Sequence, residues 1–134
     1  MTADNRLLSE RFPRSSNYNP DWLIASASGG ANALWMIEWL ATALDLRPGM
    51  RVLDLGCGRA ATSIFLRLEF GVQVWATDLW FDVSENAQRI RDAGVEDGVF
   101  PIHADAGPCL SPRSSSTPSC ALIPSFTTGR TTCT

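Results

Sequence analysis

The stretch VLDLGCGRA, residues Val52 to Ala60, decides the fold of this chain. It begins as a short apolar run of strand-forming residues, which is typical of a strand buried on both faces. Gly56 and Gly58 then stand where this strand must turn into a helix. Glycines let the backbone approach a ligand closely, and the first turn of the following helix supplies unpaired N–H groups. The stretch therefore predicts a strand, a tight turn that can bind a ligand, and a helix.

The sequence around this stretch alternates between helical and strand patterns. Apolar residues recur at spacings of three and four in the expected helices, and glycines or prolines punctuate the boundaries. The expected helices span 32–46, 61–70 and 82–93, and the expected strands span 50–55, 72–78 and 98–105. Pro101 lies in the last strand and indicates an edge position. An α-β-α-β-α-β order with short connections predicts an α/β protein with a parallel sheet and right-handed crossovers.

An acid closes the second expected strand. Asp78 is placed where a carboxylate can accept both hydroxyls of a ribose, as in dinucleotide-binding βαβ units. A Gly-x-Gly pair alone is a weak pattern, but here it follows a buried strand, precedes an amphipathic helix and has this acid in register. The combination predicts a nucleotide-containing cofactor. The plainer alternative is a tight turn together with a strand-terminal Asp that caps the next helix.

Three segments carry a family resemblance. LRPGMRVLDLGCGRA (46–60), VWATDLW (74–80) and VFPIHADA (99–106) together resemble the first three motifs of class I S-adenosylmethionine-dependent methyltransferases. The similarity is closest to the small-molecule and lipid-modifying branch that includes the cyclopropane-fatty-acid-synthase-like enzymes, and it covers roughly residues 33–106. It implies a Rossmann-like, doubly wound parallel sheet that is incomplete, holding the first three strands with flanking helices. It also implies S-adenosyl-L-methionine as cofactor and methyl transfer to a small-molecule or lipid acceptor.

The resemblance assigns eight residues to cofactor binding: Asp54, Gly56, Cys57, Gly58, Asp78, Leu79, Asp105 and Ala106. Asp54, Gly56 and Gly58 would lie along the methionine part of the cofactor. Asp78 would bind the ribose hydroxyls with Leu79 against the adenine, while Asp105 would hydrogen-bond the adenine amino group. The third glycine of the usual pattern is Ala60 here, a small and commonly tolerated change.

Other enzyme chemistry remains open on this sequence. GCGRAA (56–61) also matches the Gly-x-Gly-x-x-Ala pattern of NAD(P)-dependent oxidoreductases, although Asp54 and the HADA ending favour the methyltransferase. Cys57 could be a nucleophile, but it has no His partner nearby in sequence and suits a small filler between glycines. His103 could be a base or simply end a strand. No catalytic residue is assigned, because methyl transfer mostly needs positioning and in-line approach.

Aromatic residues are numerous for so short a chain. Trp22, Trp35, Trp39, Trp80 and Phe81 could line a substrate pocket or a lid. Packing in the core is an equally good interpretation for Trp35 and Trp39.

Composition narrows the possible partners. The 134 residues carry a net charge of -3 without a basic cluster, which argues against nucleic-acid binding. One His and widely spaced cysteines argue against a zinc site. Without a secretion signal, a disulfide framework is not expected either. The N-terminus has charges where a signal peptide would be apolar, and no apolar run could span a membrane, so we expect a cytoplasmic protein. The oligomeric state is open.

The composition changes after residue 106. Residues 107–134 are rich in Ser, Thr and Pro and hold only two charged residues, Arg113 and Arg130. We therefore expect an N-terminal arm or lid (1–31), half of a methyltransferase domain (32–106) and an aberrant, disordered tail (107–134). Back-translation from the third base of the Gly107 codon restores a loop and an apolar strand typical of the family, which indicates a frameshift or a sequencing error. The first strand would then lack a partner on one edge, leaving a marginally stable and inactive fragment as the alternative to an active enzyme.

Overall fold

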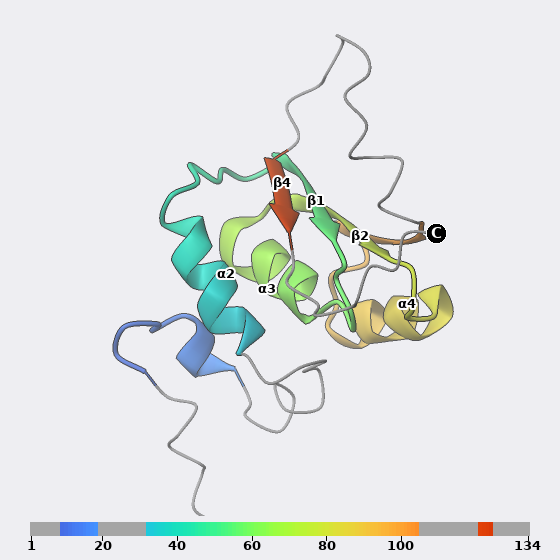
Figure 1. Cartoon of the computed structure of the whole chain (residues 1–134), viewed down its shortest axis with the longest axis horizontal. Coiled ribbons are helices and arrows are strands. Elements are labelled where there is room, and N and C mark those ends of the chain that lie inside the picture. Colours follow the sequence, from blue (N-terminus) through green and yellow to red (C-terminus); the bar gives the residue numbers. More distant parts are fainter. Residues whose placement is uncertain (1–8, 19–31, 105–120, 125–134) are drawn as a thin grey trace, which may run out of the picture.

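A four-stranded parallel sheet in the order β3-β2-β1-β4 organises the computed structural model, which describes residues 9–18, 32–104 and 121–124. Figure 1 shows the arrangement of the elements. The strands are β1 (Arg51–Leu55), β2 (Gln73–Asp78), β3 (Val99–His103) and β4 (Ala121–Pro124). The helices are η2 (Ser15–Asn17), α2 (Ala33–Ala41), α3 (Ala61–Phe70) and α4 (Val83–Asp92). The predicted Rossmann-like α/β class is confirmed, with all three predicted strands and helices in place.

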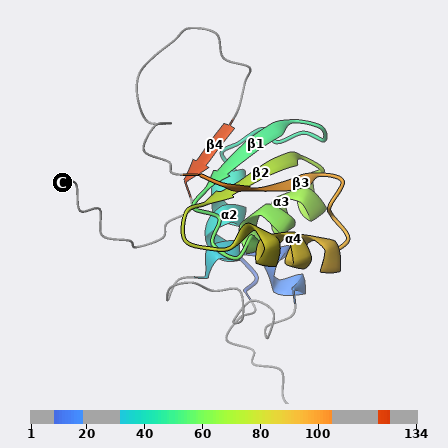
Figure 2. The same ribbon diagram turned by 90° about the vertical axis from the view of Figure 1, so that its right-hand side faces the viewer.

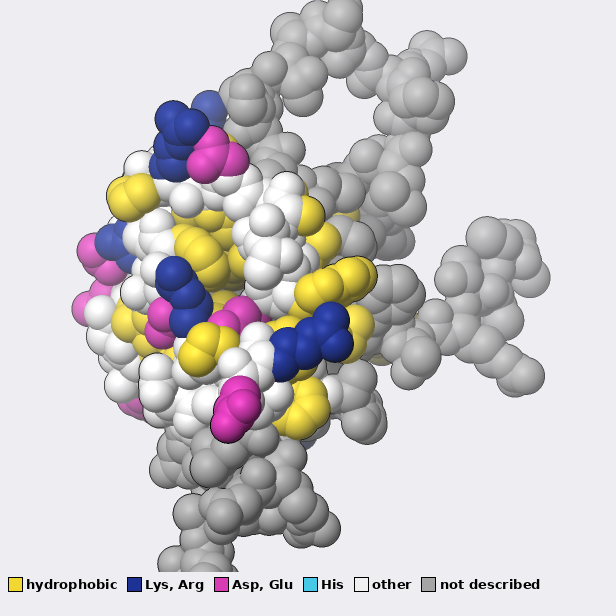
Figure 3. Space-filling view, turned by 90° about the vertical axis from the view of Figure 1, so that its left-hand side faces the viewer, with side chains coloured by type: hydrophobic (Ala, Val, Ile, Leu, Met, Phe, Trp, Pro, Cys, Tyr) yellow, Lys and Arg dark blue, Asp and Glu magenta, His cyan; other side chains and the backbone are white. Residues whose placement is uncertain are grey.

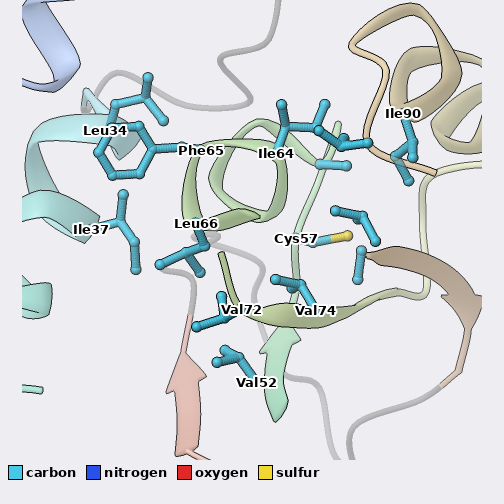
Figure 4. Close-up of a cluster of buried hydrophobic side chains, with 14 residues drawn as sticks. Leu34, Ile37, Val52, Cys57, Ile64, Phe65, Leu66, Val72, Val74 and Ile90 are labelled. Carbon is cyan, nitrogen blue, oxygen red and sulfur yellow. The ribbon is translucent and has the colours of Figure 1, made fainter. Parts of the chain in front are cut away.

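The hydrophobic core lies between the sheet and the helices. Helices α2, α3 and α4 all cover the same face of the sheet (Figure 2). Val52, Val74 and Val99 stand opposite one another in register on β1, β2 and β3, and each is at most 1% exposed. Ile64 and Phe65 of α3 belong to the same cluster of buried side chains (Figure 4). Removing these apolar side chains from water is the main stabilising contribution to such a layer.

The opposite face of the sheet carries its own apolar row. Leu53, Trp75 and Phe100 are register partners on neighbouring strands, and the rings of Trp75 and Phe100 lie 5.1 Å apart. All three are half-buried, because none of the described helices lies on this face (Figure 2).

Local capping explains several of the helix ends that the sequence predicts, although α2 ends at Ala41 and not at the predicted residue 46. The side chain of Asp82 accepts hydrogen bonds from the N–H groups of Ser84 and Glu85, so α4 begins directly after it. Asn32 caps α2 in the same way. Gly71 ends α3 in the left-handed conformation, with φ of 66°, as a C-terminal glycine does.

Part of the predicted N-terminal arm lies against α2. The buried carboxylate of Glu38 accepts the N–H groups of Arg14 and Ser15 at 3.0 and 2.8 Å. The ring of Phe12 stacks on that of Trp35 at 5.6 Å. Residues 1–8 and 19–31 of the predicted arm lie outside the described residues.

The outer edge of β1 differs from the sequence-based expectation. We expected this edge to lack a partner, but β4 pairs with it in parallel from Val52↔Ala121 to Leu55↔Pro124. The run Ala-Leu-Ile is a short strand-forming segment, and a proline is tolerated at the end of an edge strand. The short apolar run stands within a Ser/Thr/Pro-rich segment, and that composition predicts disorder rather than a strand. Residues 105–120 and 125–134, including the rest of the predicted disorder, lie outside the described residues.

Candidate functional site

The turn between β1 and α3 is held against the end of β2. Gly56 and Gly58 have φ of 74° and 57°, and Ala60 follows with φ of 60°, so the turn uses the left-handed region three times. The N–H groups of Gly56 and Cys57 both donate to the carbonyl oxygen of Thr77, at 2.8 and 3.1 Å. The two glycines adopt this conformation without steric cost, whereas Ala60 carries strain of about 1 kcal/mol.

The carboxylate of Asp78 joins this turn to the one that follows β2. Oδ2 accepts the N–H of Gly58 at 2.8 Å, while Oδ1 accepts the N–H groups of Trp80 at 2.7 Å and Phe81 at 3.2 Å. Asp78 therefore does cap the following turn, as the plainer alternative suggested, and it also bonds the glycine turn. Each carboxylate oxygen can accept more than one hydrogen bond, so the side chain keeps capacity for a ligand hydroxyl.

Asp54 lies beneath the turn and is fully buried. Its Oδ2 accepts the hydroxyl groups of Thr62 at 2.6 Å and Ser63 at 2.7 Å, both on the first turn of α3. Hydrogen bonds to an ionised acceptor are stronger than those between neutral groups. Asp54 thus fixes the N-terminus of α3 to β1. Its contact with the methionine part of a cofactor stays a prediction.

Cys57 is a buried thiol in the middle of the turn. Burial raises its pKa above the ordinary value, and the nearby negative charges of Asp54 and Asp78 raise it further. The nucleophilic form of a cysteine is the thiolate, which such surroundings disfavour. Cys57 also belongs to the same core cluster as Val74 (Figure 4). These surroundings favour the filler interpretation over a nucleophile.

Exposed side chains form the rim of the site. Leu79 is 41% and Trp80 is 85% exposed, directly after Asp78. The guanidinium of Arg59 stands over the ring of Phe81 at 5.8 Å. His103 is exposed and is the register partner of Asp78 on β3. Six of the eight predicted cofactor-binding residues are thus on the two adjacent segments that end β1 and β2.

Several predicted residues are not part of this arrangement. Asp105, Ala106 and Trp22 lie outside the described residues. The interpretation of Trp39 as a core residue is wrong, because its side chain is 60% exposed on α2. Trp35 is half-buried and packs against the N-terminal arm.

The structure adds polar residues that sequence analysis missed. Asn86, on α4, is 3% exposed and donates from Nδ2 to the carbonyl oxygen of Gly58 at 2.8 Å. Thr62 and Ser63 hold Asp54, as described above. The sequence holds one indication that Asn86 is buried. It lies four residues before Ile90, and residues at this spacing share one face of a helix.

The described residues place limits on other kinds of site. Within 9–18, 32–104 and 121–124, no group of three or more His, Cys, Asp or Glu side chains is arranged to hold a metal ion. In the same residues, no helix has the length and apolarity needed to cross a bilayer. On the face shown in Figure 3, basic, acidic and apolar side chains are interspersed.

Comparison with known proteins gave matches among solved structures. No protein-family model and no curated protein sequence matches the chain. A protein of Galdieria sulphuraria, provisionally assigned as a sarcosine dimethylglycine methyltransferase, matches with 26% identity and a TM-score of 0.52, over 55% of this chain and 29% of its own. The cyclase SpnF matches with 23% identity and a TM-score of 0.50, over 54% and 27%. A methyltransferase of Geobacter sulfurreducens solved with S-adenosyl-L-homocysteine matches with 32% identity and a TM-score of 0.48, over 57% and 31%.

These matches establish what the chain is similar to. They cover its N-terminal part, and they include S-adenosylmethionine-dependent methyltransferases, among them one assigned to small-molecule substrates. The chain spans 27% to 31% of the length of these three structures. The cyclase shares the fold, and one fold can host different reactions, so a function must be argued from the site itself.

Proposed function

We propose that this chain carries the S-adenosylmethionine-binding part of a class I methyltransferase, which transfers a methyl group to a small-molecule or lipid acceptor. The observation that carries the proposal is the bond between Gly58 and Asp78. It places a left-handed glycine turn and a strand-terminal carboxylate side by side at the carboxyl ends of two adjacent parallel strands. Ligands of open α/β sheets bind at these ends.

The residues present fit such a cofactor. Asp78 already accepts three hydrogen bonds, which leaves about one of its four lone-pair sites for a ribose hydroxyl. The exposed side chain of Leu79 can contact the adenine ring. The first N–H groups of α3 precede its first intrahelical bond, from Ile64 to Ala60, and can bind a carboxylate. When bound, S-adenosylmethionine supplies a methyl group on a positively charged sulfur. The chain's own contribution is to bind and orient, and no described residue needs to act as a base.

An NAD(P)-dependent oxidoreductase is the second candidate, because the same turn matches its motif. A thermal-shift assay with S-adenosylmethionine, S-adenosylhomocysteine, NAD and NADP separates the two. We expect only the first two compounds to raise the melting temperature, since a ligand that binds the folded state alone stabilises it. A shift with NAD or NADP alone would overturn the methyltransferase proposal.

The acceptor is proposed only as a class. The likeness to a structure assigned as a sarcosine dimethylglycine methyltransferase supports a small organic molecule. The exposed Trp80 and Leu79 beside the proposed cofactor site offer an apolar surface that suits such a molecule or a lipid chain. Transfer of labelled methyl groups to small-molecule and lipid extracts by the protein translated in the alternative frame after residue 106 tests this part of the proposal.

We also propose that residues 107–134 are read out of frame. The support is the loss of acidic residues after Asp105 and the family-like loop and strand in the alternative frame. β4 pairs with β1 in the sequence as printed, and the alternative frame predicts a strand as well. The proposal therefore concerns only which side chains follow β3. DNA sequencing across codons 100–140 tests it, and an early stop in the alternative frame would contradict it. An out-of-frame tail would leave cofactor binding without methyl transfer.

A further inference from the structure

Asn86 binds the same glycine of the turn as Asp78 does. Its Nδ2 donates to the carbonyl oxygen of Gly58 at 2.8 Å, although the two residues are 28 positions apart. Asn86 is 3% exposed, and a buried amide of this kind is costly unless it is hydrogen-bonded. Its other amide atom, Oδ1, accepts from the guanidinium of Arg89 at 3.2 Å. That bond fixes the orientation of the amide, so Nδ2 is the atom that faces Gly58.

The two bonds at Gly58 act on different peptide planes. Asp78 binds the N–H of the peptide that precedes the Gly58 α-carbon, and Asn86 binds the carbonyl of the peptide that follows it. Each peptide unit is planar, so fixing both planes fixes the two dihedral angles between them. Glycine is the residue with the widest choice of those angles, and here its φ is 57°. Without Asn86, the Gly58 carbonyl would keep only the longer contact from the Cys57 thiol, at 3.8 Å, as a side-chain donor among the described residues.

We propose that Asn86 is a positioning residue for the cofactor site. By holding the Gly58 carbonyl, it keeps the Gly58 N–H directed at Asp78 and the turn in the shape that admits the cofactor. The inference rests on the proposed function, since it concerns binding of S-adenosylmethionine or its product at the same turn. Helix α4 would thus affect cofactor binding indirectly, by holding the turn, and would not contact the cofactor.

The test compares three variants of the full 134-residue chain by calorimetric titration with S-adenosylhomocysteine. Asn86→Asp keeps the shape and Oδ1 but replaces the donor with a second acceptor. Asn86→Ser is a milder change that removes the amide. Gln88→Ala is the control, because Gln88 is exposed on the same helix and bonds only to side chains of α4 among the contacts observed.

We expect Asn86→Asp to weaken binding about tenfold, which corresponds to about 1.4 kcal/mol. Gln88→Ala should bind as the wild type does. Hydrogen exchange should speed up more at the Gly58 amide than at the amides of β2 in both Asn86 variants, whereas a general loss of stability would speed up both alike.

Each result has a definite meaning. If the wild type fails to bind S-adenosylhomocysteine, the proposed function fails, and this inference fails with it. If the wild type binds and the folded Asn86 variants bind equally well, only the positioning role is wrong. If neither Asn86 variant folds at any temperature while Gln88→Ala folds, Asn86 serves stability and not positioning, which also overturns the inference.

Discussion

Gly58 donates its N–H to the carboxylate of Asp78 over 2.8 Å, across 20 positions of sequence. This bond connects the turn after β1 with the turn after β2. The two segments that would face a cofactor are thereby linked, so a substitution in one segment should also change the conformation of the other.

Asp78→Asn should impair both binding and stability. The Asn side chain has one acceptor oxygen and one NH2 group in place of two acceptor oxygens. Its NH2 group would therefore face another donor, either the Gly58 N–H or the N–H groups of Trp80 and Phe81. We expect at least tenfold weaker binding of S-adenosylhomocysteine and a loss of about 1–3 kcal/mol in the free energy of unfolding. Asp92→Asn is the control, because Asp92 is exposed and accepts from Gln88 at the end of α4. Equal behaviour of the two variants in calorimetry and denaturant titration would contradict the account.

Two adjacent alanines should differ in their response to substitution by glycine. Ala60 has φ of 60°, whereas Ala61 begins α3 with ordinary helical geometry. Ala60→Gly relieves left-handed strain that about offsets the loss of a buried methyl group, so stability should change by less than about 1 kcal/mol. Ala61→Gly gains nothing and should cost about 1–2 kcal/mol, combining a helix-propensity loss with a lost buried methyl group. Urea denaturation measures both, and a larger loss at Ala60 than at Ala61 would show that the turn is not as described.

The hydroxyl of Thr62 should matter because it bonds a buried carboxylate. Thr62→Val keeps the shape of the side chain and removes the 2.6 Å bond to Asp54. We expect a loss of about 1.5–3 kcal/mol in the free energy of unfolding, as for bonds to charged groups. Thr42→Val is the matched control, since the Thr42 hydroxyl bonds the Trp39 carbonyl on the exposed surface. The prediction fails if both substitutions change the midpoint of denaturation equally.

The buried thiol of Cys57 predicts a loss of stability at alkaline pH. Its pKa is raised in the folded state, chiefly by burial, while an unfolded cysteine titrates near about 8.5. Above that pH the unfolded chain binds fewer protons than the folded one, so stability falls as pH rises toward the folded-state pKa. Below it, the thiol is protonated in both states and the effect is absent.

Comparison with Cys57→Ala isolates this contribution from the other cysteines and from Tyr18. The free energy of unfolding of the wild type should fall more steeply above about pH 8.5 than that of the variant, by about 1 kcal/mol over the next pH unit. Parallel curves for the two proteins in this range would mean that Cys57 is accessible to water.

Local patterns in the sequence predicted most of the fold. The spacing of Leu34, Ile37 and Ala41 predicted α2, and Asp82 and Gly71 marked helix ends through capping interactions that involve only near neighbours. The strand at Ala121–Pro124 was not predicted, because four residues carry too little periodic pattern and its partner β1 is distant in sequence.

The candidate site was predictable in its outline but not in its supports. Gly56, Gly58 and Asp78 follow a motif whose spacing is visible in the chain. The bonds from Asn86 to Gly58 and from Thr62 to Asp54 join segments that only the folded sheet brings together. A polar residue on the buried face of a helix is a hint of such a bond, but it does not name the partner.

Calorimetric titration of the purified 134-residue chain with S-adenosylhomocysteine tests the central claim most directly. The account predicts saturable binding of one molecule per chain in the micromolar range, lost on Asp78→Ala and absent with NAD. A chain that shows the far-ultraviolet circular dichroism of a folded α/β protein, yet gives no heat of binding with S-adenosylhomocysteine, would contradict it.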